Sequence, residues 1–243
     1  MPTLSAQATF ADVAGILHAA IILGPAAWGR EPLPEAHMSS NIEETLRKDL
    51  IGLFGVLRER KVPYVLAGGM AMLTYVEGRN TKDVDLVLSI ESLKRLPEIV
   101  LTDQIADFSR GKFGTLRVGV LLTTNPLFKL VEERHATHHR FLETDVRCAT
   151  VEGLILLKLY ALPALYRQGD QLIGLYENDI FMLCQQHRPA VAPLLDTLKP
   201  YVEEGQLQEL RNIVSDIQRR IERVDRARQG PPNEPPGLDK PGG

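Results

Sequence analysis

One stretch, residues 64–89, constrains the fold of this chain more than any other: "YVLAGGMAMLTYVEGRNTKDVDLVLS". A short apolar run leads into Gly68 and Gly69, and a helical pattern and an alternating apolar run follow. The alternating run holds Asp83 and Asp85, which on a β-strand point to one face about 7 Å apart. Two like charges so placed repel each other, so the pattern predicts that something positive, either a cation or a basic group, lies against them.

The two halves of this stretch favour phosphate chemistry when they occur together. Glycines between a strand and a helix start let backbone N–H groups approach a phosphate, and the helix dipole favours the anion. Magnesium prefers oxygen ligands and is typically held by one or two carboxylates together with phosphates. A Gly-Gly pair alone is usually a turn, and a D-x-D alone is usually a pair of surface acids. In this order they predict phosphoryl or nucleotidyl transfer.

Length and charge limit the alternatives. The 243 residues suffice for one large domain, or for a domain with a smaller helical one. The net charge of −3 excludes a global field that attracts nucleic acid or acidic membranes. The two cysteines form no disulfide framework, which favours a reducing, cytoplasmic location. The apolar run near the N-terminus is shorter than the ~20 residues that span a bilayer, so no membrane association is expected.

The pattern divides the chain into four parts. We interpret residues 1–37 as an N-terminal extension that need not be native to the domain, with an additional packed helix as the alternative. Residues 38–150 alternate between strand and helix patterns and predict an α/β core with a mixed sheet. Residues 151–228 are helical throughout. Residues 229–243 are rich in proline and glycine and are expected to be disordered.

Within the core, residues 90–100 are expected to form a helix. Strands are expected at 105–109 and 114–123, with Gly111 and Gly114 marking the turn between them.

Two further patterns have alternative interpretations. Apolar residues at alternating spacings of three and four within 206–227 form a narrow seam, for which packing inside the chain is favoured over a dimer contact. The group His135, His138 and His139 has the spacing of one helix face and might be taken for a metal site. No further ligand pattern completes it, so a solvated helix end is favoured.

The motifs resemble those of a known family. "AGGMAMLTYVEGRNTKDVDLVL" resembles the signature of the DNA polymerase β-like nucleotidyltransferase superfamily. Within it, "GRNTKDVDL" is similar to the form found in abortive-infection nucleotidyltransferase toxins of the AbiEii type. "CATVEGLILLKLYAL" and "YENDIFML" resemble later motifs of that group. The resemblance covers roughly residues 60–185 and implies a nucleotidyltransferase core.

The resemblance implies roles for residues of the first motif. Gly68 and Gly69 would contact the phosphates of a nucleoside triphosphate. Asp83 and Asp85 would act in catalysis by holding Mg²⁺ or Mn²⁺.

Four other residues are assigned with the same motifs. Arg79 and Thr81 would shape the phosphate loop and help to bind the nucleotide. Lys158 is the single charge within an apolar helical run. It either reaches solvent at the end of its side chain or, as we favour, contacts the triphosphate or an active-site acid. Asp179 would orient Lys158 or lie at the surface.

One departure from the family pattern concerns the third metal-binding carboxylate. Members usually carry it on a later strand, and alternation along 115–122 places Gly119 at that position. No Asp or Glu occurs between Asp107 and Glu132. Asp145, on the next strand, is the candidate substitute.

These residues predict a Mg²⁺-dependent enzyme that moves a nucleoside monophosphate from a nucleoside triphosphate to an acceptor hydroxyl. The acceptor is left open among RNA, a protein and a small molecule such as an aminoglycoside. The resemblance also implies a toxin-like enzyme with an antitoxin partner. The alternative, favoured by Gly119, is a non-catalytic module that binds a nucleotide without turnover.

Overall fold

The computed structural model describes residues 36–77, 81, 83–141 and 144–229. Its centre is a mixed seven-stranded sheet in the order β3-β4-β5-β2-β1-β7-β6. The strands are β1 (Val65–Ala67), β2 (Asp83–Leu88), β3 (Val100–Ile105), β4 (Phe108–Phe113), β5 (Leu116–Leu122), β6 (Ala136–Phe141) and β7 (Thr144–Ala149). The fold is therefore α/β, as the sequence predicted. The expectations for residues 1–35 and 230–243 lie outside the described residues.

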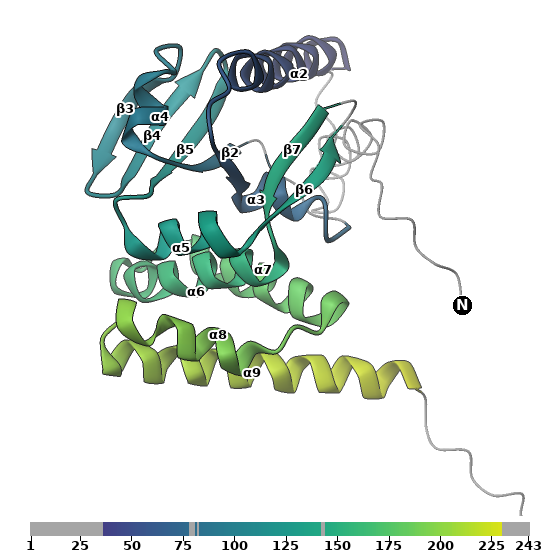
Figure 1. Cartoon of the computed structure of the whole chain (residues 1–243). Coiled ribbons are helices and arrows are strands. Elements are labelled where there is room, and N and C mark those ends of the chain that lie inside the picture. The colour runs from purple at the N-terminus through teal and green to yellow at the C-terminus, as the bar shows by residue number, and fades with distance from the viewer. Residues whose placement is uncertain (1–35, 78–80, 82, 142–143, 230–243) are drawn as a thin grey trace, which may run out of the picture.

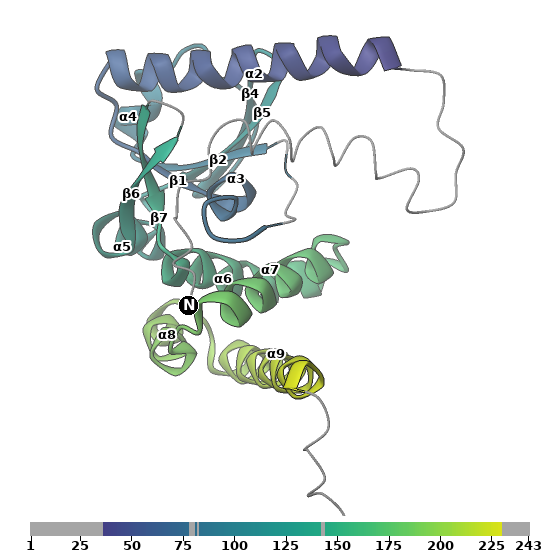
Figure 2. The same ribbon diagram turned by 90° about the vertical axis from the view of Figure 1, so that its right-hand side faces the viewer.

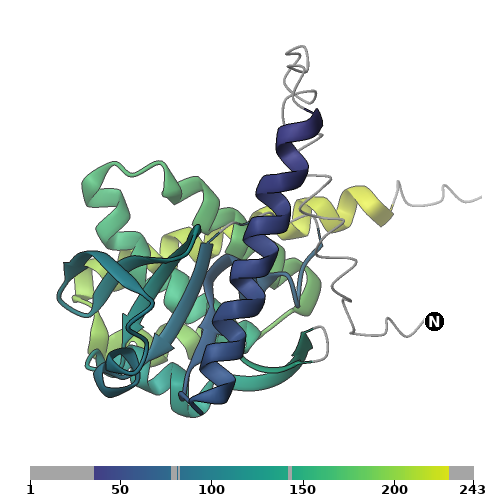
Figure 3. The ribbon, with the colours of Figure 1, turned by 90° about the horizontal axis from the view of Figure 1, so that it is seen from above.

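The helices lie on both faces of the sheet and beyond it. They are α2 (Ala36–Glu59), α3 (Gly68–Met72), α4 (Ile90–Lys94), α5 (Pro126–Arg134), α6 (Val151–Gln168), α7 (Leu172–His187), α8 (Val191–Leu198) and α9 (Glu204–Gln229), with a 3₁₀ turn η1 (Lys199–Tyr201). Helix α2 runs across one face of the sheet (Figures 1 and 3). Figure 2 shows α6 and α7 below the opposite face and α8 and α9 as a further layer. Within the described part of the chain, no helix is long and apolar enough to cross a membrane.

Because side chains alternate along β2, the two faces of the sheet differ in the residues that they present. Val84, Leu86 and Leu88 are fully buried on the face that α2 covers. Asp83 and Asp85 point to the other face, toward the helical region. Strand β2 pairs with β1 antiparallel and with β5 in parallel, so it lies inside the sheet with neighbours on both sides. The D-x-D pattern is thus carried by an internal strand.

The helix that faces these aspartates begins where its capping residue predicts. The Thr150 hydroxyl accepts a hydrogen bond from the Gly153 N–H at 3.2 Å, so α6 starts at Val151. The helix ends at Gly169, whose φ of 63° closes it in a left-handed cap. Most of the side chains between these caps are buried, because α6 lies between the sheet and the outer helices.

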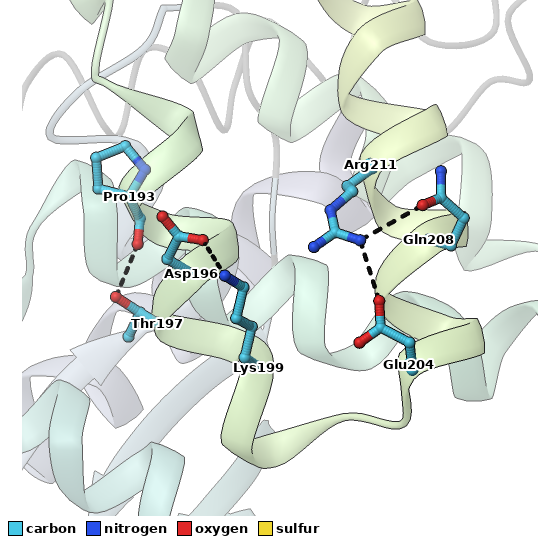
Figure 4. Close-up of polar contacts among 7 residues, drawn as sticks. All are labelled: Pro193, Asp196, Thr197, Lys199, Glu204, Gln208 and Arg211. Atoms are coloured by element: carbon cyan, nitrogen blue, oxygen red, sulfur yellow. Dashed lines mark hydrogen bonds and ion pairs between the residues drawn. The ribbon is translucent and has the colours of Figure 1, made fainter.

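The apolar seam of α9 packs inside the chain, as favoured from its spacing. Its buried members are Leu207, Leu210, Val214, Ile217 and Ile221. The turn into α9 is held by exposed polar contacts (Figure 4). Lys199 pairs with Asp196 at 2.7 Å, and Arg211 pairs with Glu204 at 3.3 Å.

Several local expectations were wrong. The segment expected as a strand at 105–109 instead contains the turn between β3 and β4. Helix α4 ends at Lys94, and the chain then forms the edge strand β3, which pairs with β4 in a hairpin. The turn between β4 and β5 contains Gly114, but Gly111 lies inside β4. Residues 136–141 form strand β6, which pairs with β7, so His138 and His139 point to opposite faces and share no helix face. The pairing of residues 136–141 with β7 makes this segment a strand. The spacing of residues within the segment does not predict that pairing.

Candidate functional site

A cavity of about 500 Å³ lies between the aspartate-bearing face of the sheet and helices α6 and α7. This is the size of a typical small-molecule pocket. The sheet and the β1–α3 junction contribute Ala67, Gly68, Asp85, Ile105, Phe108, Arg110 and Leu121. The helices contribute, among others, Leu157, Lys158, Tyr160, Ala161, Arg167, Leu172 and Tyr176. We call the first group the sheet floor and the second the helical roof.

The sheet floor is ordered by strand register. Asp85 lies opposite Ala67 on β1 and opposite Gly119 on β5, and Gly119 in turn lies opposite Arg110 on β4. These residues form one row across the sheet on the face that lines the cavity. Because Gly119 has no side chain, Arg110 is the next side chain beyond Asp85 in this row.

The carboxylate of Asp85 occupies a slot between two glycines. A Cβ atom on Gly68 would lie 1.8 Å from Oδ2 of Asp85, and one on Gly119 would lie 2.2 Å from Oδ1. Both distances are far below van der Waals contact, so neither position tolerates a side chain while Asp85 stays in place. Gly68 also has a φ of 61°, which favours glycine independently. Gly119 therefore makes room for the acid on the neighbouring strand.

Asp83 has a different environment from Asp85. It does not line the cavity, and its cross-strand partner is Arg117. The Nε atom of Arg117 lies 2.7 Å from Oδ1 of Asp83, in an ion pair too bent to be a hydrogen bond. The basic group expected against the aspartates is thus present in the protein for one of them.

The residues of the glycine loop differ in whether they line the cavity. Gly68 lines the cavity at the start of α3, whereas Gly69 is buried behind it. Thr81 lies just before β2, and its Oγ1 accepts a hydrogen bond from the Asp83 N–H at 3.3 Å. Arg79 lies outside the described residues, so its expected contact stays a prediction.

The helical roof contains a buried ion pair. Nζ of Lys158 on α6 lies 2.7 Å from Oδ2 of Asp179 on α7, and the two residues are 5% and 0% exposed. Lys158 therefore does not extend to solvent, and Asp179 holds its ammonium group in place. The same ammonium lies 4.5 Å from the centre of the Tyr176 ring, a favourable cation–π distance.

Tyr176 connects the roof with the floor electrostatically. Burial, together with the nearby charges of Asp85 and Asp179, raises the pKa of Tyr176 to about 12, while Arg110 acts in the opposite direction. The phenol therefore stays protonated near neutral pH. Sequence reasoning missed Tyr176, although it lies one helical turn before Asp179 and both face the same lysine.

The structure does not bring Asp145 to the cavity. Strand β7 is separated from β2 by β1, and Asp145 lies near its start, whereas Asp85 is level with the end of β1. Asp145 instead lies 3.0 Å from Nδ1 of His138 on the exposed surface. Nor does His139 join a metal group, because its Nε2 lies 2.9 Å from the hydroxyl of Tyr75.

The carboxylates fit one magnesium ion better than two. Among the described residues, no cluster of three or more His, Cys, Asp or Glu residues could hold a metal. Asp85 faces the cavity, and Asp83 on the same strand face is partly exposed, although its Oδ1 is paired with Arg117. Two carboxylates with water and phosphate oxygens suffice for Mg²⁺. A two-metal centre has no third carboxylate here, because Gly119 and Arg117 stand at the cross-strand positions.

The chain was compared with known proteins. Its sequence matches no protein-family model and no curated protein. A crystal structure of an antigenic nucleotidyltransferase-like protein from Paracoccidioides brasiliensis is similar, with a TM-score of 0.48 and 20% identity over 75% of this chain and 91% of that chain.

The antibiotic-resistance factor ANT(2″)-Ia is similar in two structures. A crystal structure with adenylyl-2″-tobramycin has a TM-score of 0.44 and 14% identity over 67% of this chain and 95% of that chain. A solution structure has a TM-score of 0.43 and 14% identity over 77% and 98%. At such scores and identities these likenesses carry no argument. What the fold and the site define is an α/β protein with a glycine loop and a carboxylate facing a small-molecule-sized cavity.

Proposed function

We propose that this protein is a Mg²⁺-dependent nucleotidyltransferase that binds a nucleoside triphosphate in the cavity between the sheet and α6. The observation that carries the proposal is the position of Asp85. Its carboxylate is held between Gly68 and Gly119 and lines the same cavity as the buried Lys158. A metal-binding acid, a glycine loop and a fixed ammonium group around one cavity are the elements that position and neutralise a triphosphate.

The proposed roles follow from these positions. Asp85, with Asp83 beside it, would hold Mg²⁺, which when bound neutralises charge on the phosphate oxygens. The backbone at Gly68 and Gly69 would contact the phosphates, with Arg79 and Thr81 completing the loop. Lys158 would add positive charge from the roof.

The reaction joins the acceptor to the α-phosphate of the nucleotide. A bond forms between the acceptor oxygen and the α-phosphorus, and the bond from that phosphorus to the oxygen bridging to the β-phosphate breaks. Pyrophosphate leaves, and the hydroxyl proton passes to solvent water. A general base contributes typically about 10²–10⁴-fold to such a step. Because the described residues place no third carboxylate by Asp85, we expect a slow enzyme.

A second candidate function is nucleotide binding without turnover. The specific observation that favours it is the ion pair between Arg117 and Asp83, since a cation already neutralises one of the two acids. The AbiEii-type toxin role, an antitoxin partner and a cytoplasmic location rest on the sequence resemblance and remain proposals. RNA, a protein and a small molecule remain the proposed acceptor classes.

Calorimetric titration and a transfer assay test the proposal together. Each nucleoside triphosphate is titrated into the full chain with and without Mg²⁺, and transfer of label from an α-labelled nucleotide is followed in parallel. We expect metal-dependent binding that the Asp83→Asn/Asp85→Asn variant loses. Asp145→Asn is the matched control, because its carboxylate is exposed and outside the cavity.

The outcomes separate the candidates. Binding with transfer supports the enzyme, and binding without transfer to any acceptor supports the binding module. Metal-dependent binding that survives in the double variant would place the site elsewhere.

A further inference from the structure

The charges around the cavity are unevenly distributed. Among the described lining residues, Asp85 is the only acid, whereas Arg110, Lys158 and Arg167 are basic. Lys158 is held by Asp179 and is assigned to the triphosphate in the proposed function. The other two basic residues are therefore the cations of the cavity that remain available for a ligand once Asp85 has been assigned to a metal ion.

Arg110 lies at a fixed distance from the proposed reaction centre. It is two strands from Asp85 in the same cross-strand row, which corresponds to about 10 Å at the usual strand spacing. It pairs with Asp103, with 3.9 Å between Nη1 and Oδ2, and both side chains are largely exposed. Such a pair is weak. The guanidinium also lies 5.3 Å from the centre of the Phe108 ring, within cation–π distance, and both residues line the cavity.

Arg167 lies on the roof near the end of α6. It is about 13 Å further along the helix axis than Lys158, at 1.5 Å per residue. It makes no ion pair with another described residue. The acids nearby in sequence are engaged elsewhere: Asp170 accepts a hydrogen bond from the Leu172 N–H, and Glu177 accepts one from the Tyr166 hydroxyl.

Part of the cavity wall is apolar and aromatic. Leu121 and Phe128 line it, and Tyr160 stacks edge-to-face on Phe128 with 5.8 Å between ring centres. A ligand with its hydroxyl near Asp85 and its anionic group near the arginines would place an apolar or aromatic body against this wall. Among the described lining residues, a polycation would meet these two guanidinium groups and no carboxylate other than Asp85.

We propose that the acceptor is a small hydroxyl compound with an apolar body and one anionic group, which Arg110 and Arg167 bind. The inference rests on the proposed nucleotidyl transfer for the acceptor role of this ligand. Among the acceptor classes open from the sequence, it selects a small molecule and excludes polycationic aminoglycosides. The physical reason is that guanidinium groups form strong, geometrically specific contacts with carboxylates and phosphates.

Three matched phenols test the charge preference without knowledge of the natural acceptor. They are para-hydroxyphenylpropionate, tyramine and para-ethylphenol, which share the hydroxyphenyl body and are anionic, cationic and neutral. Their dissociation constants are measured by calorimetry or ligand-observed NMR on the full chain, first without nucleotide. We expect the anion to bind at least about tenfold more tightly than the cation, the scale of one charge-assisted contact.

Variants test whether the two arginines cause the preference for the anionic phenol. Arg110→Gln/Arg167→Gln should bring the anion and the cation close to equal affinity. Arg219→Gln is the control, because Arg219 is an exposed arginine of α9 that pairs with Asp216. It should keep the full preference. Equal or tighter binding of tyramine, no binding of any probe, or a preference that survives in the double variant would overturn the inference.

Adding a nucleoside triphosphate with Mg²⁺ separates this inference from the proposed function. We expect the anionic probe and the nucleotide to bind together. If the nucleotide displaces the probe and its own affinity falls in the arginine variant, the arginines bind the triphosphate and the inference is overturned while the proposed function stands. If no nucleotide binds but the anion preference holds, the proposed function fails and the ligand class is supported.

Discussion

The sheet floor and the helical roof hold their charges in opposite ways. Beside the floor, between the neighbouring strands β2 and β5, Asp83 and Arg117 form a partly exposed ion pair, with side chains 45% and 68% exposed. On the roof, Lys158 and Asp179 are almost fully buried and come from two different helices. The floor charges can exchange protein partners for a ligand at low cost. The roof pair cannot, because separating buried charges leaves each in a medium that solvates it poorly.

Because the two ion pairs differ in burial, the roof and the floor contribute differently to stability and to ligand binding. The roof supplies a rigid ammonium group, held by Asp179, that depends on the fold and supports it. The floor supplies an acid whose position is defined by the absence of two side chains. Substitutions on the roof should therefore change stability first, and substitutions on the floor should change ligand binding first.

The largest effect is expected at the roof. Lys158→Met leaves the buried Asp179 carboxylate without its ammonium partner, which should lower the free energy of unfolding by about 3–5 kcal/mol. Replacing both members, in Lys158→Met/Asp179→Leu, should restore most of the loss. Urea denaturation measures both variants.

The exposed pair of Lys199 and Asp196 provides the control (Figure 4). Lys199→Met should leave the unfolding midpoint unchanged within error. If Lys158→Met is as stable as the parent protein, the contrast between roof and floor is wrong.

The next effect concerns the two acids of the floor. Asp85→Asn should weaken Mg²⁺-dependent nucleotide binding by about 1.5–3 kcal/mol, the scale of contacts to a charged group. Asp83→Asn should weaken it less, because Asp83 already pairs with Arg117 and lies outside the cavity. Calorimetry on the two single variants measures the difference. Equal losses would show that both acids bind the metal directly.

The third prediction tests the glycine slot. Gly119→Ala should lower stability by about 1–3 kcal/mol, because its Cβ would overlap Oδ1 of Asp85. In an Asp85→Ala background the same substitution should cost much less, which a double-mutant cycle measures. A Gly119→Asp variant should likewise displace Asp85, so a gain in metal affinity would contradict this account. That gain would show that Gly119 stands for a lost third acid.

The smallest effect is expected where the sheet meets the helices away from the cavity. His139 on β6 contacts the Tyr75 hydroxyl, and His187 on α7 lies 2.8 Å from the Tyr75 carbonyl oxygen. Burial lowers the pKa of His139 from its usual 6.5. The unfolded chain therefore binds a proton more readily than the folded protein. This stabilisation is present above about pH 6.5 and is lost as the pH falls through the folded-state pKa.

Unfolding by urea at about pH 7.5 and about pH 5.5 tests this sign. His139→Phe keeps a ring against Tyr75 and removes the titrating group, so it should show a smaller loss of stability on acidification. An equal loss in both proteins would assign the pH dependence to other groups.

Much of the fold and of the candidate site was predictable because it depends on local spacing. The order of strand, glycine pair and D-x-D predicted that Gly68 and Asp85 belong to one site, and both residues line one cavity in the structure. Thr150 defined the start of α6, and helical periodicity defined α7 and α9. These signals need no knowledge of what packs against the segment.

The remaining features depend on which strands and helices are neighbours. The sequence by itself determined that two aspartates share a strand face beside a glycine loop and that a lone lysine lies in an apolar helix. Only the tertiary structure decided that Arg117 pairs with Asp83, that Gly119 makes room for Asp85, and that residues 136–141 form an edge strand. Cross-strand register and helix docking bring together residues that are far apart in the chain. The packing of the whole core selects these partners, so the local spacing of residues cannot predict them.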